Sequence, residues 1–153
     1  MKNKFLLFFA LLGLLATVPA CGGGAIKTEG VTGVVTLDGE PLANATVYFT
    51  PAEGSTGASQ SVGKTNEAGE YKLQTLLGAA DAGTTPGDYV VTIDCVDEVE
   101  TGGTKLNDDG EEVPETEEIQ RVPARYLNAS TSGLTATVVK GANTFNFDLT
   151  SEE

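Results

Sequence analysis

The feature that most constrains the fold is a two-residue alternation of apolar and polar side chains after residue 30. Successive side chains of a β-strand point to opposite faces, so this alternation is typical of strands with one buried face. Val, Thr, Phe and Tyr, which favour strands, are frequent in these runs. Six runs show the pattern, at 31–37, 45–50, 71–74, 89–95, 134–139 and 145–150. No segment shows the apolar period of a capped helix, so we expect an all-β chain.

Turn-forming residues separate these runs at short intervals. Asp38-Gly39 is a strong hairpin pair at the end of the first run. Pro86-Gly87 precedes the run at 89–95, and further turns are predicted at 66–69 and 140–143. Short strands joined by tight turns favour an antiparallel β-sandwich.

The first 20 residues predict a secretory signal peptide. Lys2 and Lys4 give a positive start, and 5–18 is an uninterrupted apolar stretch of 14 residues. A helix needs about 20 apolar residues to cross a bilayer, so this stretch is too short for a stable membrane anchor. We therefore exclude 1–20 from the folded domain.

The end of that segment suggests a lipid anchor. Val18-Pro19-Ala20-Cys21 resembles a bacterial lipobox, in which cleavage between Ala20 and Cys21 precedes acylation of the cysteine. Two or three acyl chains, such as palmitate, would anchor the protein stably. The Gly-rich stretch 21–29 would then be a flexible tether. The resemblance implies a membrane-anchored lipoprotein of the cell envelope, facing the periplasm or the cell surface; ordinary cleavage nearby, with Cys21 incidental, is the alternative.

The segment 97–120 differs from its surroundings because it holds ten acidic residues and one basic residue. We expect a solvated and largely disordered insertion. Without it, the rest of 30–150 is close to the roughly 100 residues of a seven-stranded sandwich. Asp108, Asp109, Glu111 and Glu112 are weak candidates for an irregular calcium site, but their spacing does not fit an EF-hand loop. We therefore predict no metal site.

Composition excludes several classes of function. Seven basic and all 22 acidic residues lie after position 20, which gives that part a net charge of −15. Such a charge argues against nucleic-acid binding and against electrostatic adhesion to anionic lipid. The chain has no histidine and only two cysteines, which removes Ser-His and Cys-His pairs and zinc sites rich in these ligands. We expect no catalytic residues and no cofactor, and we expect Cys95 to be buried and unreactive.

The order of the motifs resembles a known family. The matching stretches are 33–42, 45–51, 65–71, 86–93, 131–134 and 145–149, together with Tyr126. They are similar to the carboxypeptidase regulatory-like domain, a transthyretin-like (prealbumin-like) β-sandwich related in architecture to immunoglobulin-like sandwiches. The resemblance covers about 30–150 apart from the acidic insertion, and its C-terminal part is similar to small bacterial lipoproteins. It implies a folding, adhesive or spacer module. Without histidine, neither peptidase chemistry nor hydroxyisourate hydrolysis carries over.

These observations together predict a lipoprotein that displays one non-catalytic β-sandwich, with a structural or binding role in the cell envelope. Its partner would be an envelope protein or a glycan, and not a nucleic acid. Two alternatives stay open. One is an accessory subunit of an envelope enzyme or transporter, and the other is a weak calcium- or glycan-binding module.

Overall fold

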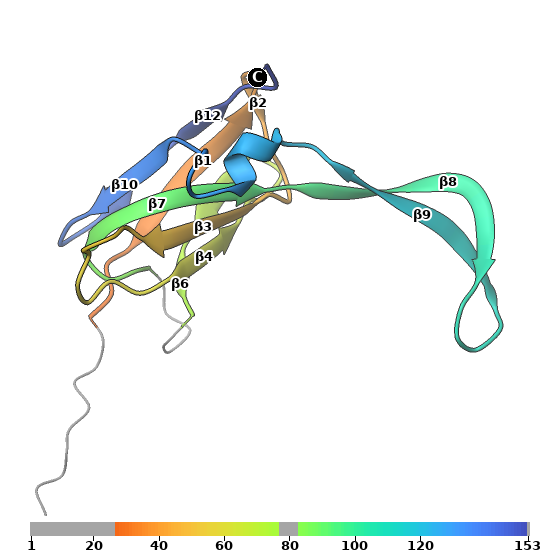
Figure 1. The fold of residues 1–153 in the computed structure, drawn as a ribbon, viewed down its shortest axis with the longest axis horizontal. Helices are drawn as coiled ribbons and strands as arrows, with labels where there is room; N and C mark the ends of the chain where they lie inside the picture. The colour runs from red at the N-terminus through yellow and green to blue at the C-terminus, as the bar shows by residue number, and fades with distance from the viewer. Residues whose placement is uncertain (1–26, 77–82, 153) are drawn as a thin grey trace, which may run out of the picture.

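The computed structural model describes residues 27–76 and 83–152 of the 153-residue chain. The predicted signal segment 1–20, the predicted cleavage site at Ala20 and the predicted lipidation position Cys21 lie outside the described residues. The described residues form strands, turns and one short 3-10 helix, with no α-helix (Figure 1). The all-β prediction is therefore confirmed. Among these residues, no helix has the length and apolar character needed to cross a membrane.

The first sheet is built around strand β1 (Val31–Leu37). This strand pairs antiparallel with β2 (Glu40–Pro41) and β5 (Glu70–Lys72), and parallel with β11 (Asn143–Thr144) and β12 (Phe147–Leu149). The parallel pairs differ from the purely antiparallel sheets that the sequence predicted. The strand before β11 belongs to the other sheet, and a connection that crosses between sheets does not impose the reversal of direction that a hairpin does.

The second sheet is antiparallel throughout. Its five strands lie in the order β10 (Leu134–Val138), β7 (Gly87–Asp94), β3 (Thr46–Pro51), β4 (Ser61–Lys64) and β6 (Gln74–Thr75). Strand β4 brings part of the region between the second and third predicted runs into the sheet. The alternation therefore located most of the strands near their true positions, but it did not indicate β4.

Both sheets direct apolar side chains into one common core. Phe49 lies at its centre, with ring centroids 5.7 Å from Tyr89, 6.0 Å from Phe145 and 6.2 Å from Phe147. Aromatic pairs at these separations add to the large apolar area that each ring buries. Cys95 is only 1% exposed, which confirms its expected burial. Two stacked sheets around one core are consistent with a sandwich.

A buried polar network closes the end of the core where the described chain begins. The Tyr89 hydroxyl donates to the Thr85 carbonyl at 2.7 Å and lies 2.9 Å from the Thr84 hydroxyl. Thr84 in turn donates to the Ser59 carbonyl, and its backbone forms a bridge with Glu29. Buried polar groups need such partners, and no buried side-chain nitrogen or oxygen among the described residues lacks one.

The acidic segment forms an ordered ribbon that projects from the two sheets (Figure 1). It consists of β8 (Val96–Leu106) and β9 (Glu112–Gln120), paired antiparallel with an irregularity after Glu100. We call residues 96–120 the arm and the other described residues the body. The expectation of a largely disordered insertion at 97–120 was wrong, although the arm is almost entirely exposed, as expected.

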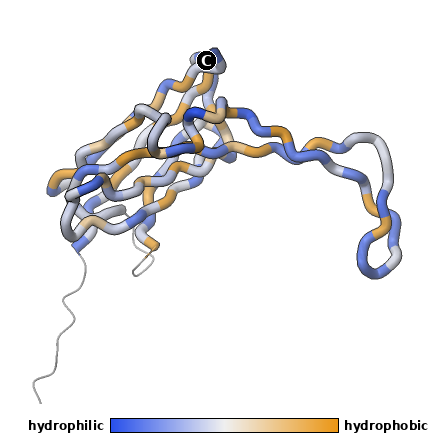
Figure 2. The backbone as a smooth tube through the Cα atoms, viewed as in Figure 1, coloured by the Kyte–Doolittle hydropathy of each residue, from blue (hydrophilic) through white to orange (hydrophobic). Residues whose placement is uncertain are grey.

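The order of the arm comes from backbone pairing and from its turn. At the tip, the Asn107 side-chain oxygen accepts hydrogen bonds from the backbone N–H groups of Asp109 and Glu111. An Asn side chain that bonds its own following backbone in this way stabilises a reversal of the chain. The two halves then provide each other with hydrogen-bond partners without needing a core. Figure 2 shows that hydrophilic positions dominate the arm, with scattered apolar positions along it.

The arm is joined to the body by specific polar contacts. The Gln120 side-chain amide donates to an Asp94 carboxylate oxygen at 2.8 Å, and the Arg121 N–H donates to the Cys95 carbonyl at 2.9 Å. The Arg121 guanidinium forms an ion pair with Asp97 at 3.4 Å. These contacts fix the position at which the arm leaves the body.

The 3-10 helix η1 (Ala124–Leu127) follows the arm and packs against the end of the chain. The Arg125 guanidinium donates to the Thr150 carbonyl at 2.8 Å and lies 4.6 Å from the centroid of the Tyr126 ring. The Tyr126 hydroxyl accepts from the Thr150 N–H at 3.2 Å. Burial raises the pKa of Tyr126, but its hydrogen bonds to Thr150 and Arg125 outweigh this effect, so the pKa lies below its ordinary value.

Candidate functional site: a polar groove beside strand β4

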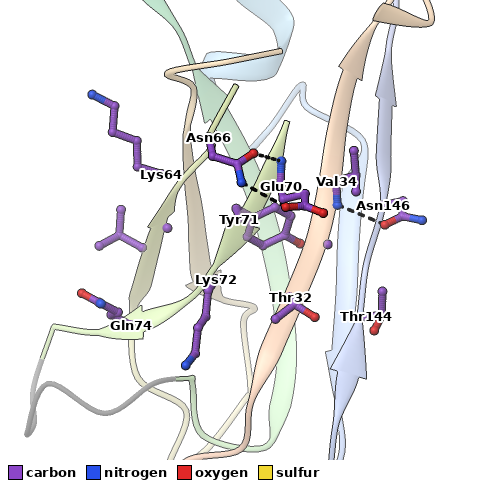
Figure 3. Close-up of a pocket in the computed structure, with 13 residues that line it drawn as sticks. Thr32, Val34, Lys64, Asn66, Glu70, Tyr71, Lys72, Gln74, Thr144 and Asn146 are labelled. Carbon is purple, nitrogen blue, oxygen red and sulfur yellow. Dashed lines mark hydrogen bonds between the residues drawn. The ribbon is translucent and has the colours of Figure 1, made fainter. Parts of the chain in front are cut away.

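A groove of about 820 Å³ lies on the outer surface where β4 of the second sheet adjoins β5 and β1 of the first. It is open to solvent and lined by polar groups from both sheets (Figure 3). Hydroxyl, amide and charged side chains all contribute. They belong to Thr32, Thr144, Asn66, Gln74, Asn146, Lys64, Lys72 and Glu70.

Two glycines allow the strands beneath the groove to approach closely. A Cβ at Gly33 would overlap the carbonyl oxygen of Phe145, and a Cβ at Gly63 would lie 2.8 Å from the carbonyl oxygen of Lys72. Only glycine fits where backbones come this close. Because both glycines line the groove, part of its wall is backbone.

Several of the polar groups are held in place before any ligand arrives. The Asn66 side-chain oxygen accepts from the backbone N–H groups of Ala68 and Glu70, and its amide donates to the Glu70 carboxylate at 3.0 Å. The Asn146 oxygen accepts from the Val34 N–H at 3.0 Å, at the gap between β11 and β12. Groups fixed in this way lose little conformational freedom on binding, which favours affinity.

The two lysines give the groove a positive character. Lys64 and Lys72 are both exposed, and neither forms an ion pair with a carboxylate among the described residues. Figure 3 shows their side chains on neighbouring strands, with the Asn66–Glu70 pair beside them. Two unpaired ammonium groups in a strongly acidic protein are available to a negatively charged ligand.

The groove offers binding groups and no activated nucleophile. The Tyr71 hydroxyl donates to the Phe145 carbonyl at 2.8 Å, and burial raises the pKa of this tyrosine. Among the described residues, the hydroxyls of Thr32 and Thr144 form no hydrogen bond with a lysine or a carboxylate. Nucleophilic catalysis needs such an adjacent base.

Cys95 is likewise unsuited to chemistry. Burial raises the pKa of its thiol, and its Sγ–H points to the Ala43 carbonyl at 3.5 Å. A reactive cysteine needs the opposite, an exposed and electropositive setting that favours the thiolate.

The structure does not gather the weak calcium candidates into a site. Asp108, Asp109, Glu111 and Glu112 lie at the tip of the arm, and all four are exposed. Among the residues that the structure describes, no group of three or more carboxylate or thiol side chains is arranged to hold a metal ion.

Comparison with known proteins gives little further guidance. No protein-family model and no curated protein matches the chain. A solved structure of a 9R-lipoxygenase from Cyanothece PCC8801 is similar over 80% of this chain, with 15% identity and a TM-score of 0.36. The chain spans 16% of the length of that lipoxygenase. A similarity at this level supports no conclusion about fold or activity, so the site rests on the residues of this chain.

The sequence did not indicate the groove. Nothing in a single sequence shows that β4 and β5 adjoin, so the sequence could not place Lys64 and Lys72 in one groove. The available signal was the pair Ser61 and Gly63, two small residues at alternate positions that are both buried in the structure.

Proposed function

We propose that this chain is a lipid-anchored, non-catalytic module of the bacterial cell envelope, and that its groove binds an acidic glycan. The body would be a transthyretin-like sandwich of the carboxypeptidase regulatory-like type. The anchor would be formed by acyl chains on Cys21. The module would hold a ligand or a neighbouring component at the membrane and would not transform it.

Two observations support the fold and the anchor. Turns that carry the family resemblance lie at strand ends, with Asp38-Gly39 between β1 and β2 and the turn at 66–69 between β4 and β5. The apolar stretch at 5–18 and the lipobox-like sequence that ends at Cys21 support export and acylation.

The inference that the ligand is an acidic glycan rests on one observation. Lys64 and Lys72 form no ion pair among the described residues and line a groove of amide and hydroxyl groups. Amides and hydroxyls match the hydroxyl groups of sugar rings, and ammonium groups match the carboxylates of uronic acids. A neutral glycan is less well matched, because the groove presents two cations and its only aromatic side chain, Tyr71, is 3% exposed.

The groove is tested by titrating the protein with trigalacturonate, an acidic trisaccharide, and with galactotriose, its neutral counterpart. We expect trigalacturonate alone to shift the NMR signals of β4 and β5. The double variant Lys64→Gln/Lys72→Gln should weaken its binding about tenfold, because two exposed charge pairs are lost. The control Lys27→Gln/Lys140→Gln removes two exposed lysines outside the groove and should change the affinity less than about twofold. Equal weakening by both pairs, or equal binding of both sugars, would contradict the proposal.

The anchor is tested separately by intact mass and membrane fractionation in a Gram-negative host. We expect loss of residues 1–20, a mass increase from acyl chains, and recovery in the membrane fraction. The variant Cys21→Ser should be unacylated and should leave that fraction. An unmodified, soluble wild-type product would exclude the anchor and would leave the groove proposal intact.

A further inference from the structure

A second hollow lies where the arm begins. It encloses about 220 Å³ and is lined by Tyr48, Thr92, Ile93, Asp94, Gln120 and Leu127. Tyr48 is half-buried, and Leu127 exposes 39% of its surface. The hollow therefore combines an aromatic ring, an aliphatic side chain and a carboxylate.

This combination suits the side chain of an arginine or a lysine. The apolar stem of such a residue packs on aliphatic and aromatic groups, and its charged head pairs with a carboxylate or lies over a ring. One Asp94 oxygen accepts from Gln120 at 2.8 Å, which orients the carboxylate. Asp94 has no ion-pair partner among the described residues.

The arm extends this surface with further acidic side chains. Residues two apart on a strand share a face, and directly paired residues of neighbouring strands share it too. Asp94, Val96, Glu98 and Glu100 therefore follow one another along the face that begins at the hollow. Glu98 pairs directly with Glu118 on that face. The result is a row of carboxylates that continues outward from the hollow.

The arm also has features that binding of a partner would stabilise. Its two strands pair with each other and with no other strand among the described residues. Isolated two-stranded ribbons are at best marginally stable in water, and directly opposed like charges such as Glu98 and Glu118 weaken them further. On the face of Glu98 and Glu118, Val96 is 41% exposed. A cationic partner would relieve the repulsion and cover this side chain.

We propose that the hollow and the adjoining arm face dock an extended basic segment of a partner protein. One Arg or Lys side chain of that segment occupies the hollow beside Tyr48 and Asp94, and further basic side chains pair with Glu98, Glu100 and Glu118. Charge complementarity selects this occupant over a second copy of the chain, because each copy carries a net −15 after residue 20. The proposal depends on neither the lipid anchor nor the groove.

The test uses the full-length chain and a fluorescein-labelled decapeptide of alternating Arg and Thr, with the corresponding Glu-Thr peptide as a reference. Fluorescence anisotropy should show binding of the Arg-Thr peptide alone, weakening as salt is raised. The arm variant Glu98→Gln/Glu100→Gln/Glu118→Gln should weaken it about tenfold, from three exposed charge pairs. Asp94→Asn, which keeps an acceptor for Gln120, should weaken it about threefold.

The matched control is Glu40→Gln/Glu53→Gln/Glu67→Gln, which removes the same charge from exposed positions of the body. It should change the affinity less than about twofold. Equal weakening by the two triple variants would overturn the proposal, since it would mean that only net charge matters. Sedimentation that shows self-association lost in the arm variant would also overturn it, because the occupant would then be a second copy. Unchanged thermal melting of the body in each variant excludes unfolding as the cause.

Discussion

Strands β7 and β8 are consecutive in the chain, yet they are stabilised in different ways. In β7, every second side chain from Tyr89 to Ile93 is buried against the opposite sheet. In β8, which begins two residues after β7 ends, almost every side chain is exposed. Strand β7 has a hydrogen-bonded neighbour on each side, whereas β8 has β9 alone.

The difference shows that a segment of this protein can form a paired β-strand without the burial of apolar side chains that stabilises the body. In the body, the hydrophobic effect and side-chain packing hold the sheets together. In the arm, backbone hydrogen bonds satisfy the polar groups, but little apolar surface is removed from water. The body should therefore respond to changes in packing, and the arm should respond to charge, solvent and partners.

The largest expected effect comes from truncating the centre of the core. Phe49→Ala should lower the free energy of unfolding by about 3–5 kcal/mol, because the ring is fully buried against three other aromatic rings. Val99→Ala in the arm should change it by less than about 0.5 kcal/mol. Urea unfolding of the two variants measures both values. Comparable losses would mean that the arm contributes to the core.

Amide hydrogen exchange should separate the two regions within one molecule. We expect the amides of β8 and β9 to exchange at least about 100-fold faster than the hydrogen-bonded amides of β3 and β7, because the arm opens without unfolding the core. NMR-detected exchange at neutral pH provides the measurement. Similar protection in both regions would show that arm and body unfold as one cooperative unit.

A smaller loss of stability is expected from a change in η1, the part of the body that follows the arm. Tyr126→Phe removes the hydroxyl that accepts from the Thr150 N–H and from Arg125, and should cost about 1 kcal/mol. Tyr48→Phe is the matched control, because the Tyr48 hydroxyl has no hydrogen bond among the described residues. It should cost less than about 0.5 kcal/mol. The difference in melting temperature between the variants tests this, and equal melting temperatures would contradict it.

The smallest expected effect is on the pH dependence of stability, and it comes from the exposed carboxylate of Asp38 in the body. Hydrogen bonds from the side chain and the backbone N–H of Ser151 hold the pKa of Asp38 below its usual value. A carboxyl group whose pKa is lowered in the folded state stabilises the fold above its ordinary pKa, and this stabilisation is lost as pH falls through the folded-state pKa. Asp38→Asn should therefore flatten the dependence of stability on pH in the acidic range.

Urea unfolding of both proteins between pH 3 and pH 7 checks the prediction for Asp38. Asparagine tolerates the positive φ of 52° at this position, so the substitution changes charge without adding backbone strain. Identical pH profiles would mean that the Ser151 contact contributes nothing to folding.

The sequence predicted the core strands of the body better than it predicted the arm. The core strands were predictable because Val47 and Phe49 alternate with polar residues, and Tyr89, Val91 and Ile93 continue the same two-residue period of apolar side chains. That period reflects burial directly. Strand β4 was not predictable, because its inward positions are Ser61 and Gly63, which carry no apolar signal. The arm was missed because hydrogen bonding between two exposed strands leaves no periodic mark on side-chain polarity.

The candidate sites were less predictable than the fold. The groove depends on the close approach of β4 and β5, and the smaller hollow depends on the return of Gln120 beside Asp94. Both are contacts between residues that are distant along the chain or belong to different elements. A single sequence provides the chemical groups, but their convergence is a property of the assembled sheets.

The direction of β7 also limits the distance between the lipid anchor that we propose and the base of the arm. The described chain enters the body near Glu29, whose bridge partner Thr84 precedes the start of β7 at Gly87, and the arm leaves just after β7 ends at Asp94. Figure 1 shows the two points at opposite ends of the body. Eight residues of strand span about 24 Å, and a tether from Cys21 to Glu29 extends at most about 28 Å. A chain held at Cys21 would thus present the base of its arm within about 50 Å of the bilayer, which limits docking to partners at that height.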